Sequence, residues 1–305
     1  MNEESPSSND AHRAQLLALA KALRPELHRY CARLMGSVID GEDVVQDALM
    51  RAFDGLDDLR DLPPFRTWLF RIAHNRALDL LRSRALRATE AMEAAVDAID
   101  HANPDPEETV MRQEASKTAV SRFTELPVLQ RSVVVLKDVL GEPLADIADL
   151  LNLSIDAVKG HLARGRARLR EIDAHIAPHT GERTASPAVA HYVALFNRRD
   201  WDGLRALLAD DVRLHQSLHP MRSGATDVGT FFTIYAKSTD VWLAPAWLEG
   251  REVIAVFEHR TAAKPHHFMW LEWHGPRIRF IRDYRYVEYV IDDAELVPAA
   301  VPGVG

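Results

Sequence analysis

The feature that most constrains this chain is a pair of helical patterns joined by a turn of three residues, 152–154. Before the turn, Leu144, Ile147 and Leu151 recur at the spacing of one helix face. After it, Ser154 is a preferred N-cap residue, and a second helical pattern runs to residue 170. Because neither helix buries its apolar face alone, we expect the two to pack together as a helix-turn-helix.

The second helix of the pair is strongly basic. From residue 154 to residue 171, five basic residues stand against two acidic ones. A basic helix behind a short turn is typical of a recognition helix that enters the DNA major groove, where its first residues meet base edges and later arginines hold phosphates. The candidate DNA-binding residues are Asp156, Lys159, Gly160, His161, Arg164, Arg166 and Arg168. The alternative is a solvated amphipathic hairpin that binds no DNA.

Length, cysteine content and charge limit the class of protein. A chain of 305 residues is long enough for two or three domains, each with its own core. The single cysteine, Cys31, excludes an intramolecular disulfide bond, and no run reaches the roughly 18 uncharged apolar residues of a membrane span. No signal-peptide pattern opens the chain, so we expect a cytoplasmic protein without membrane association. The net charge of −8 disfavours indiscriminate coating of nucleic acid.

The apolar periodicity divides the chain into three segments. Residues 12–86 and 113–173 are predicted to be helical throughout, with an acidic linker at 87–112 and a Pro-Pro loop at 59–64 between helices. A second linker, 174–187, leads into residues 188–292, and 293–305 form a tail. In that last segment helices at 188–209 precede strand-like runs at 212–218, 253–259, 267–274 and 277–291. The predicted fold class is multidomain: two all-α domains followed by an α+β domain.

The two helical segments resemble bacterial RNA polymerase sigma factors of the small extracytoplasmic-function (ECF) type. Residues 125–170 resemble region 4, which reads the −35 promoter element. Residues 40–53 resemble region 2.2, which grips the polymerase clamp, and 65–82 resemble regions 2.3 and 2.4, which open and read the −10 element. The resemblance implies core RNA polymerase (β′ clamp and β flap) and promoter DNA as partners. It implies no cofactor, no metal and no catalytic residue, because the polymerase performs the chemistry.

The resemblance also implies site residues within the first segment. Those expected to bind polymerase are Glu42, Asp43, Gln46, Asp47 and Arg51, whose acceptors suit basic groups on a partner. The alternative for the acids is an ordinary helix N-terminus. Those expected to open and hold the −10 element are Arg60, Asp61, Leu62, Arg66, Trp68, Arg71, Asn75, Arg76 and Arg82. Trp68 can stack on an unpaired base or pack in the core, and its spacing favours the core.

The last segment resembles a SnoaL-like (NTF2-like) domain in the runs 192–212 and 277–286. That fold is a curved sheet covered by helices, which together enclose a pocket. The residues expected to line the pocket are His215, Tyr235, Trp270 and Asp283. The alternative for the aromatic residues is the core or the sheet surface, and the adjacent His266 and His267 are expected at a turn rather than at a metal.

Function follows from the combination of segments. We expect a sigma factor that directs core polymerase to promoters and carries a fused regulatory domain. One alternative is a stand-alone helix-turn-helix regulator, which would leave the region 2-like helices unexplained. The other is a sigma factor whose C-terminal domain binds or turns over a small molecule.

Overall fold

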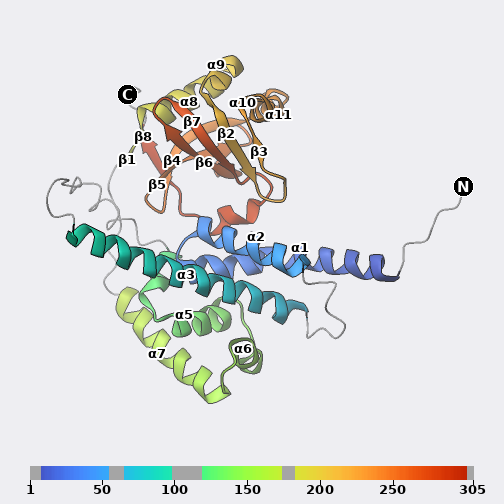
Figure 1. Cartoon of the computed structure of the whole chain (residues 1–305), viewed down its shortest axis with the longest axis vertical. Helices are drawn as coiled ribbons and strands as arrows, with labels where there is room; N and C mark the ends of the chain where they lie inside the picture. Colours follow the sequence, from blue (N-terminus) through green and yellow to red (C-terminus); the bar gives the residue numbers. More distant parts are fainter. Residues whose placement is uncertain (1–7, 55–64, 98–118, 174–182, 301–305) are drawn as a thin grey trace, which may run out of the picture. The chain divides into compact units, whose positions relative to one another are not determined.

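The computed structural model describes residues 8–54, 65–97, 119–173 and 183–300 (Figure 1). They form two compact units, the first made of the described residues up to 173 and the second of residues 183–300. The first is all-helical and the second is α+β, as the sequence predicts. The Pro-Pro loop at 59–64 and most of both predicted linkers lie outside the described residues.

Three long helices begin the first unit: α1 (Ser8–Met35), α2 (Val38–Asp54) and α3 (Phe65–Asp97). Gly36 ends α1 with a φ of 76°, and the Ser37 hydroxyl accepts the Asp40 amide at 3.1 Å at the start of α2. The helices approach closely, since a Cβ on Gly41 would lie 2.6 Å from the Ala32 Cα. Helix α3 continues into the predicted linker as far as Asp97, because that stretch is rich in the strong helix formers alanine and glutamate.

Five further elements complete the described part of the first unit: η2 (Ser121–Glu125), α5 (Val128–Val134), the π-helical turn η3 (Val135–Val139), α6 (Leu144–Leu151) and α7 (Ile155–Asp173). Helices α6 and α7 form the predicted helix-turn-helix. Asn152 ends α6 in the left-handed conformation with a φ of 54°, and the Ser154 hydroxyl accepts the Ala157 amide at 3.2 Å. Helix α7 packs tightly on α5, because a Cβ on Gly165 would come within 2.5 Å of Val134.

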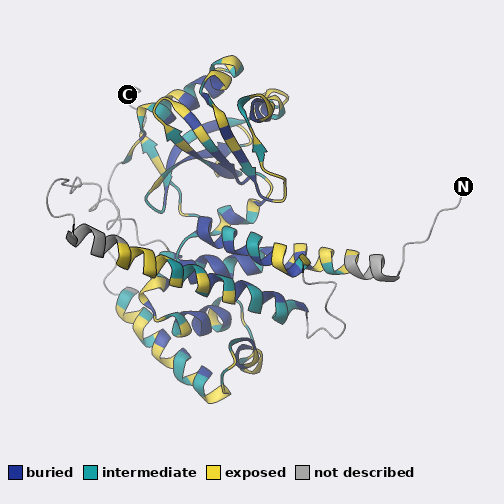
Figure 2. Cartoon of the chain, in the orientation of Figure 1, coloured by how far each residue is buried: buried dark blue, intermediate teal, exposed yellow. Residues whose placement is uncertain are grey.

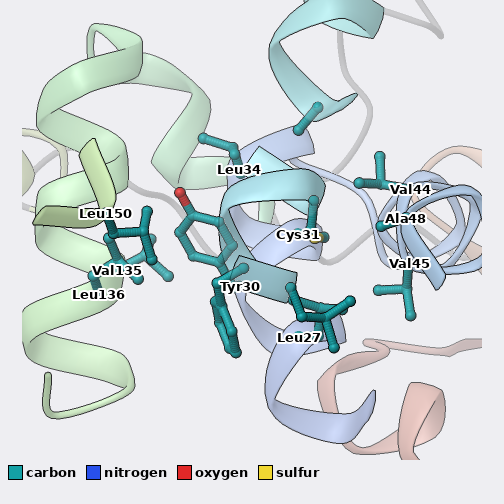
Figure 3. Close-up of a cluster of buried hydrophobic side chains, with 14 of the residues drawn as sticks. Leu27, Tyr30, Cys31, Leu34, Val44, Val45, Ala48, Val135, Leu136 and Leu150 are labelled. Carbon is teal, nitrogen blue, oxygen red and sulfur yellow. The ribbon is translucent and has the colours of Figure 1, made fainter. Parts of the chain in front are cut away.

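All the helical elements of the first unit share one hydrophobic cluster. Figure 3 shows Tyr30 and Leu34 of α1 beside Val135, Leu136 and Leu150, which belong to the second group of helices. Tyr30, Leu34, Val135 and Leu136 have no exposed surface. The α1–α3 segment and the α5–α7 segment, predicted as separate domains, are therefore packed against each other in this structure.

The second unit is a curved eight-stranded sheet with helices over it. Its helical elements are α8 (Pro187–Asn197), α9 (Trp201–Ala206), α10 (Ala225–Gly229), α11 (Phe231–Ala236) and η4 (Glu288–Asp293). Its strands are β1 (Arg183–Thr184), β2 (Leu208–Gln216), β3 (Arg222–Ser223), β4 (Trp242–Leu248), β5 (Arg251–Phe257), β6 (His267–His274), β7 (Arg277–Asp283) and β8 (Val297–Ala300). The strand order is β1-β8-β4-β5-β6-β7-β2-β3, and β2 runs parallel to β7.

Two strand predictions differ from the structure. The run at 277–291 is not one strand, since β7 ends at Asp283 and η4 follows, and β2 begins at Leu208 rather than at residue 212. Strand β4 was not predicted because Pro245 lies at its centre, where a proline argues against a strand. The side chain of Asn197 fixes α8 to β4: its amide donates to the Leu243 carbonyl at 2.9 Å and its oxygen accepts the Leu243 amide at 3.0 Å.

The core of the second unit lies between the helices and one face of the sheet. Tyr192 and Phe196 of α8 and Tyr235 of α11 pack edge to face or tilted within an aromatic group that also contains Phe231 and Phe232. Figure 2 shows the buried residues concentrated along the strands and on the inner faces of these helices. Among the described residues, none of the helices combines the length and the apolar character that crossing a membrane requires.

Candidate polymerase and promoter interfaces

Helix α7 presents its basic residues outward. Val158, Leu162 and the buried Gly165 face the rest of the unit, which leaves the other side of the helix accessible (Figure 2). Of the seven candidate −35 residues, Asp156, Lys159, Arg164, Arg166 and Arg168 are exposed, and Gly160 and His161 are half-buried. In the free chain Arg166 is held by Asp138, with nitrogen–oxygen distances of 2.5 and 2.9 Å. The helix thus offers a cationic face of the kind that follows a DNA groove.

The candidate polymerase-binding residues on α2 divide into surface and core positions. Arg51 is exposed, and Asp43, Gln46 and Asp47 are half-buried. Asp47 accepts hydrogen bonds from Arg76, one of the candidate −10 residues, at 2.6 and 2.8 Å. Glu42 was expected at the surface, among the polymerase-binding residues. In the structure it has no exposed surface and pairs with Arg24 at 2.5 Å. Its carboxylate is therefore part of a buried ion pair rather than of an accessible contact face.

Two candidate −10 residues on α3 are engaged by acids from the helix-turn-helix segment. Arg66 pairs with Glu142 at 2.5 Å and also with Glu26 of α1 at 2.7 Å. Arg71 donates to the carboxylate of Asp149 at 3.1 Å and to its backbone carbonyl at 2.9 Å. Both guanidinium groups keep part of their surface, at 35% and 42% exposure, so they are held at the rim of the contact rather than inside it.

The remaining candidate −10 residues occupy different environments. Asn75 and Arg82 are exposed and line a cavity of about 740 Å³ between α3 and the segment that contains α5 and α6. Trp68 is half-buried and packs against the shared core, and the centre of its ring lies 5.7 Å from the centre of the Phe65 ring. This packing favours the core interpretation. Arg60, Asp61 and Leu62 lie outside the described residues.

A buried polar contact lies behind that cavity. The hydroxyl of Tyr30 and Nδ1 of His74 are 2.8 Å apart, and the Tyr30 hydroxyl also bonds the side chain of Ser132 on α5. Burial lowers the pKa of His74 to about 4, and the positive charge of Arg82 adds to the effect. His74 is thus neutral at physiological pH.

A second site lies at one end of the C-terminal sheet. Asp283, at the end of β7, is buried and accepts a hydrogen bond from the amide of Gln216 at 2.8 Å. Nε2 of His267 lies 3.1 Å from the other oxygen of Asp283 and 3.2 Å from the hydroxyl of Tyr235. Burial raises the pKa of Tyr235 well above its usual value, and the negative charge of Asp283 adds a smaller rise. The phenol of Tyr235 therefore remains a neutral hydrogen-bonding group.

The buried group is connected to the surface through a second histidine. Nδ1 of His266 lies 3.0 Å from Nδ1 of His267, and Nε2 of His266 lies 3.3 Å from the carboxylate of Glu288. Next to it is a cavity of about 380 Å³, whose lining includes Tyr235, His266, His267, Lys237 and Arg285. The guanidinium of Arg285 lies 5.0 Å from the centre of the Tyr235 ring. These contacts connect the buried carboxylate of Asp283 to the rim of the cavity through the two histidine rings.

Only two of the four predicted pocket residues belong to this site. Tyr235 and Asp283 are in it, whereas His215 and Trp270 both pair with Arg282 in the sheet register and lie on the opposite face. Side chains alternate along a strand, so His215 and Gln216 cannot point the same way. Sequence reasoning missed Gln216, His267 and Arg285. The His266-His267 pair was the available signal, and the predicted strand at 267–274 coincides with β6, but no sequence pattern indicated that His267 would lie against Asp283. The described residues contain no group of three or more His, Cys, Asp or Glu side chains arranged to hold a metal.

Comparison with known proteins decides the family. Family models match Sigma-70 region 2 at residues 19–87, Sigma-70 region 4 at 121–169 and a SnoaL-like domain at 189–289. The ECF RNA polymerase sigma factor SigW of Bacillus subtilis is 32% identical over 155 residues, which cover 48% of this chain and 83% of SigW. The chain belongs to the ECF family of RNA polymerase sigma factors.

Other relatives extend beyond the two sigma regions. The ECF sigma factor SigG of Mycobacterium tuberculosis is 31% identical over 222 residues, covering 64% of this sigma factor and 59% of SigG. The solved structure of SigJ from Mycobacterium tuberculosis is 20% identical, covers 90% of this chain and 97% of its own, and has a TM-score of 0.35. The family-model match at residues 189–289 shows that this RNA polymerase sigma factor carries a fused C-terminal SnoaL-like domain.

The state of His74 predicts how the helical unit of this sigma factor responds to acid. Since its pKa is lower in the folded chain than the usual value of about 6.5, the unfolded state binds the proton first as the pH falls. The free energy of unfolding should be fully retained above about pH 6.5 and should fall between there and about pH 4, by about 3 kcal/mol at most.

Urea denaturation followed by helical circular dichroism measures this effect. The variant His74→Gln, which keeps a polar side chain but does not titrate, should lose less stability than the wild type between pH 7 and about pH 4.5. Equal losses in the two proteins would show that His74 does not control the acid response.

Proposed function

We propose that this sigma factor binds core RNA polymerase and promoter DNA in the division of labour that its two sigma regions imply. Helix α2 is proposed to dock on the β′ clamp, α3 to open and hold the −10 element, and the helix-turn-helix to read the −35 element near the β flap. The observation that carries the proposal is the accessible basic face of α7 behind a capped turn, in one chain with a region 2 match. We infer from these proposed partners that the protein acts in the cytoplasm.

For the −35 element, the exposed N-terminal part of α7 is proposed to reach base edges. Asp156 and Lys159 form an exposed pair at 3.1 Å, which solvent screens and which a base can replace at small cost. Arg164, Arg166 and Arg168 follow on the helix and are proposed to hold phosphates. Phosphate contacts are strongly salt-dependent, so binding of the isolated sigma factor to DNA should weaken steeply with salt.

For polymerase, the accessible acids and Arg51 of α2 are proposed as the contact face, without Glu42. A stand-alone helix-turn-helix regulator that does not bind core polymerase would require neither this surface of α2 nor α3. Retention of the protein by core polymerase therefore separates the two interpretations.

The pull-down with core polymerase has a matched pair of variants on α2. Asp47→Lys reverses a candidate contact, and Asp54→Lys makes the same change at an exposed position of the same helix outside the candidate set. We expect Asp47→Lys to weaken retention about tenfold and Asp54→Lys to leave it within about twofold, because charge at an interface matters only where it meets the partner.

Arg51→Glu serves as a second test, since Asp47 also bonds Arg76 and its loss perturbs that pair. Arg51→Glu should weaken retention as well, with an unchanged circular dichroism spectrum. If core polymerase does not retain the wild-type protein, the proposed function is wrong. If it retains the wild type and both variants equally well, the assignment of the α2 face is wrong.

We infer a regulatory role for the C-terminal domain, with a small-molecule ligand in the cavity beside Tyr235 as a second candidate function. The support is a cavity of about 380 Å³ with Lys237 and Arg285 in its lining, next to a buried network of Asp283, His267 and Tyr235. A concave site with a few convergent polar groups is typical of ligand pockets. We propose binding rather than turnover, because the buried carboxylate is already bonded to Gln216 and His267.

Deletion of residues 186–305 tests the regulatory role. The truncated protein should be retained by core polymerase as well as the full chain, because all the candidate polymerase contacts lie in the first unit. Its transcription from a responsive promoter should change several-fold. Equal output from full-length and truncated proteins would contradict a regulatory role for the domain, whatever its ligand.

A further inference from the structure

The sheet of the C-terminal domain turns one face away from the core of that domain. The core cluster takes residues from four neighbouring strands, among them Leu214, Ile281, Leu271 and Ile254. Because side chains alternate along a strand, residues an odd number of positions from these point outward. Four of the outward residues form a group that we name the outer platform: Arg213 of β2, Phe280 of β7, Trp270 of β6 and Arg251 of β5.

The outer platform is a continuous row of cation, ring, ring and cation. The guanidinium carbon of Arg213 lies 5.8 Å from the centre of the Phe280 ring, its partner in the strand register. The rings of Phe280 and Trp270 meet edge to face, with their centres 6.0 Å apart. The guanidinium carbon of Arg251 lies 5.5 Å from the centre of the Trp270 ring. Each ring is therefore in cation–π contact with one arginine.

The outer platform is accessible and positively charged. Its two arginines are exposed and its two rings are half-buried. Neither arginine side chain forms a hydrogen bond or an ion pair with another residue that the structure describes. On the same face lie Arg282, opposite Trp270 in the register, and Glu272, opposite Phe280. Since three arginines stand against one acid, the face carries a net positive charge.

This chemistry suits a single strand of nucleic acid. Accessible rings on a sheet stack on bases, and arginines beside them hold phosphates. A base stacks on a ring more strongly than an exposed guanidinium does, so an arriving base can displace Arg213 or Arg251 from its ring and free it for a phosphate.

Three other occupants fit the outer platform less well. Duplex DNA offers no base face on which a ring could stack. A second copy of the platform would bring arginines against arginines, which is unfavourable at an interface. An acidic protein segment would satisfy the arginines but would leave the two rings without a partner.

We propose that the outer platform binds single-stranded DNA, with bases on Trp270 and Phe280 and phosphates on Arg213 and Arg251. The site belongs to the C-terminal domain and is separate from the candidate −10 and −35 residues, which belong to the first unit. The choice of DNA rests on the proposed function, because opening of a −10 element exposes such a strand. The binding of a single strand by the platform does not depend on it.

Paired substitutions in the full-length protein test the phosphate contacts. Arg213→Gln with Arg251→Gln removes two charges from the platform. Arg198→Gln with Arg205→Gln is the matched control, since these exposed arginines lie at the end of α8 and on α9, the helices that cover the other face of the sheet. The probe is a labelled oligothymidylate of about 12 nucleotides, and its binding is followed by fluorescence anisotropy over a range of salt concentrations.

The platform variant should bind the probe about three- to tenfold more weakly at low salt. The slope of log affinity against log salt should become smaller by about 1.4, because each lost phosphate contact with a single strand removes about 0.7. The control variant should keep the wild-type slope and an affinity within about twofold of wild type.

The stacking is tested by removing the rings and by crosslinking. Trp270→Leu with Phe280→Leu keeps apolar side chains on the sheet and should weaken binding about tenfold or more. Thermal unfolding shows whether each variant is folded. A probe that carries 5-iododeoxyuridine should crosslink, under ultraviolet light, to Trp270 or Phe280 of the full-length protein, as located by mass spectrometry.

Each result supports or overturns a stated part of the proposal. Equal affinity and salt slope in the platform and control variants, or the absence of crosslinks at both rings, would overturn the platform as a binding site. Equal affinity for the duplex form of the probe, or displacement by polyglutamate as effective as by unlabelled probe, would overturn the single-strand assignment. Oligouridylate binding about tenfold tighter than oligothymidylate would make RNA the occupant instead. Core polymerase should retain all these variants as it retains the wild type, so a failure of the proposed function appears in that assay alone.

Discussion

A buried arginine that bonds backbone carbonyls connects the two sigma regions of this chain. Arg131 on α5 donates to the carbonyl of Leu34 at the end of α1, while Tyr30 and Leu34 share one hydrophobic cluster with Val135 and Leu136. An unpaired arginine inside a core would be costly, and Arg131 finds acceptors on both sides of the contact: the carbonyl of Leu34 on α1 and the carbonyls of Thr124 and Leu126. The packing of the two sigma regions depends on this bond and on the apolar core that they share.

The contact between the two sigma regions combines weak and strong interactions. The ion pairs of Arg66 and Arg71 are partly exposed and individually weak. The shared apolar core that contains Leu34, Val135 and Leu136 is fully buried and contributes more to holding the regions together.

Sequence patterns predicted the parts of this chain that follow local rules. The turn at 152–154, the Ser154 cap and the buried Ile147 follow from spacing and side-chain chemistry alone. The burial of Glu42 was not predicted, because its partner Arg24 lies on another helix and no local pattern links them. For the same reason only Tyr235 and Asp283 of the four predicted pocket residues lie in the C-terminal site. Whether His215 or Gln216 faces inward depends on the strand register, which the neighbouring strands set.

The central claim is that two helical modules of one chain direct a polymerase to promoters, and mapping transcript 5′ ends tests it most directly. Purified core polymerase would transcribe a promoter-containing template with and without the full-length protein. The account predicts discrete start sites a fixed distance downstream of paired −35 and −10 elements, and only when the protein is present. The same pattern of starts with and without the protein would contradict it.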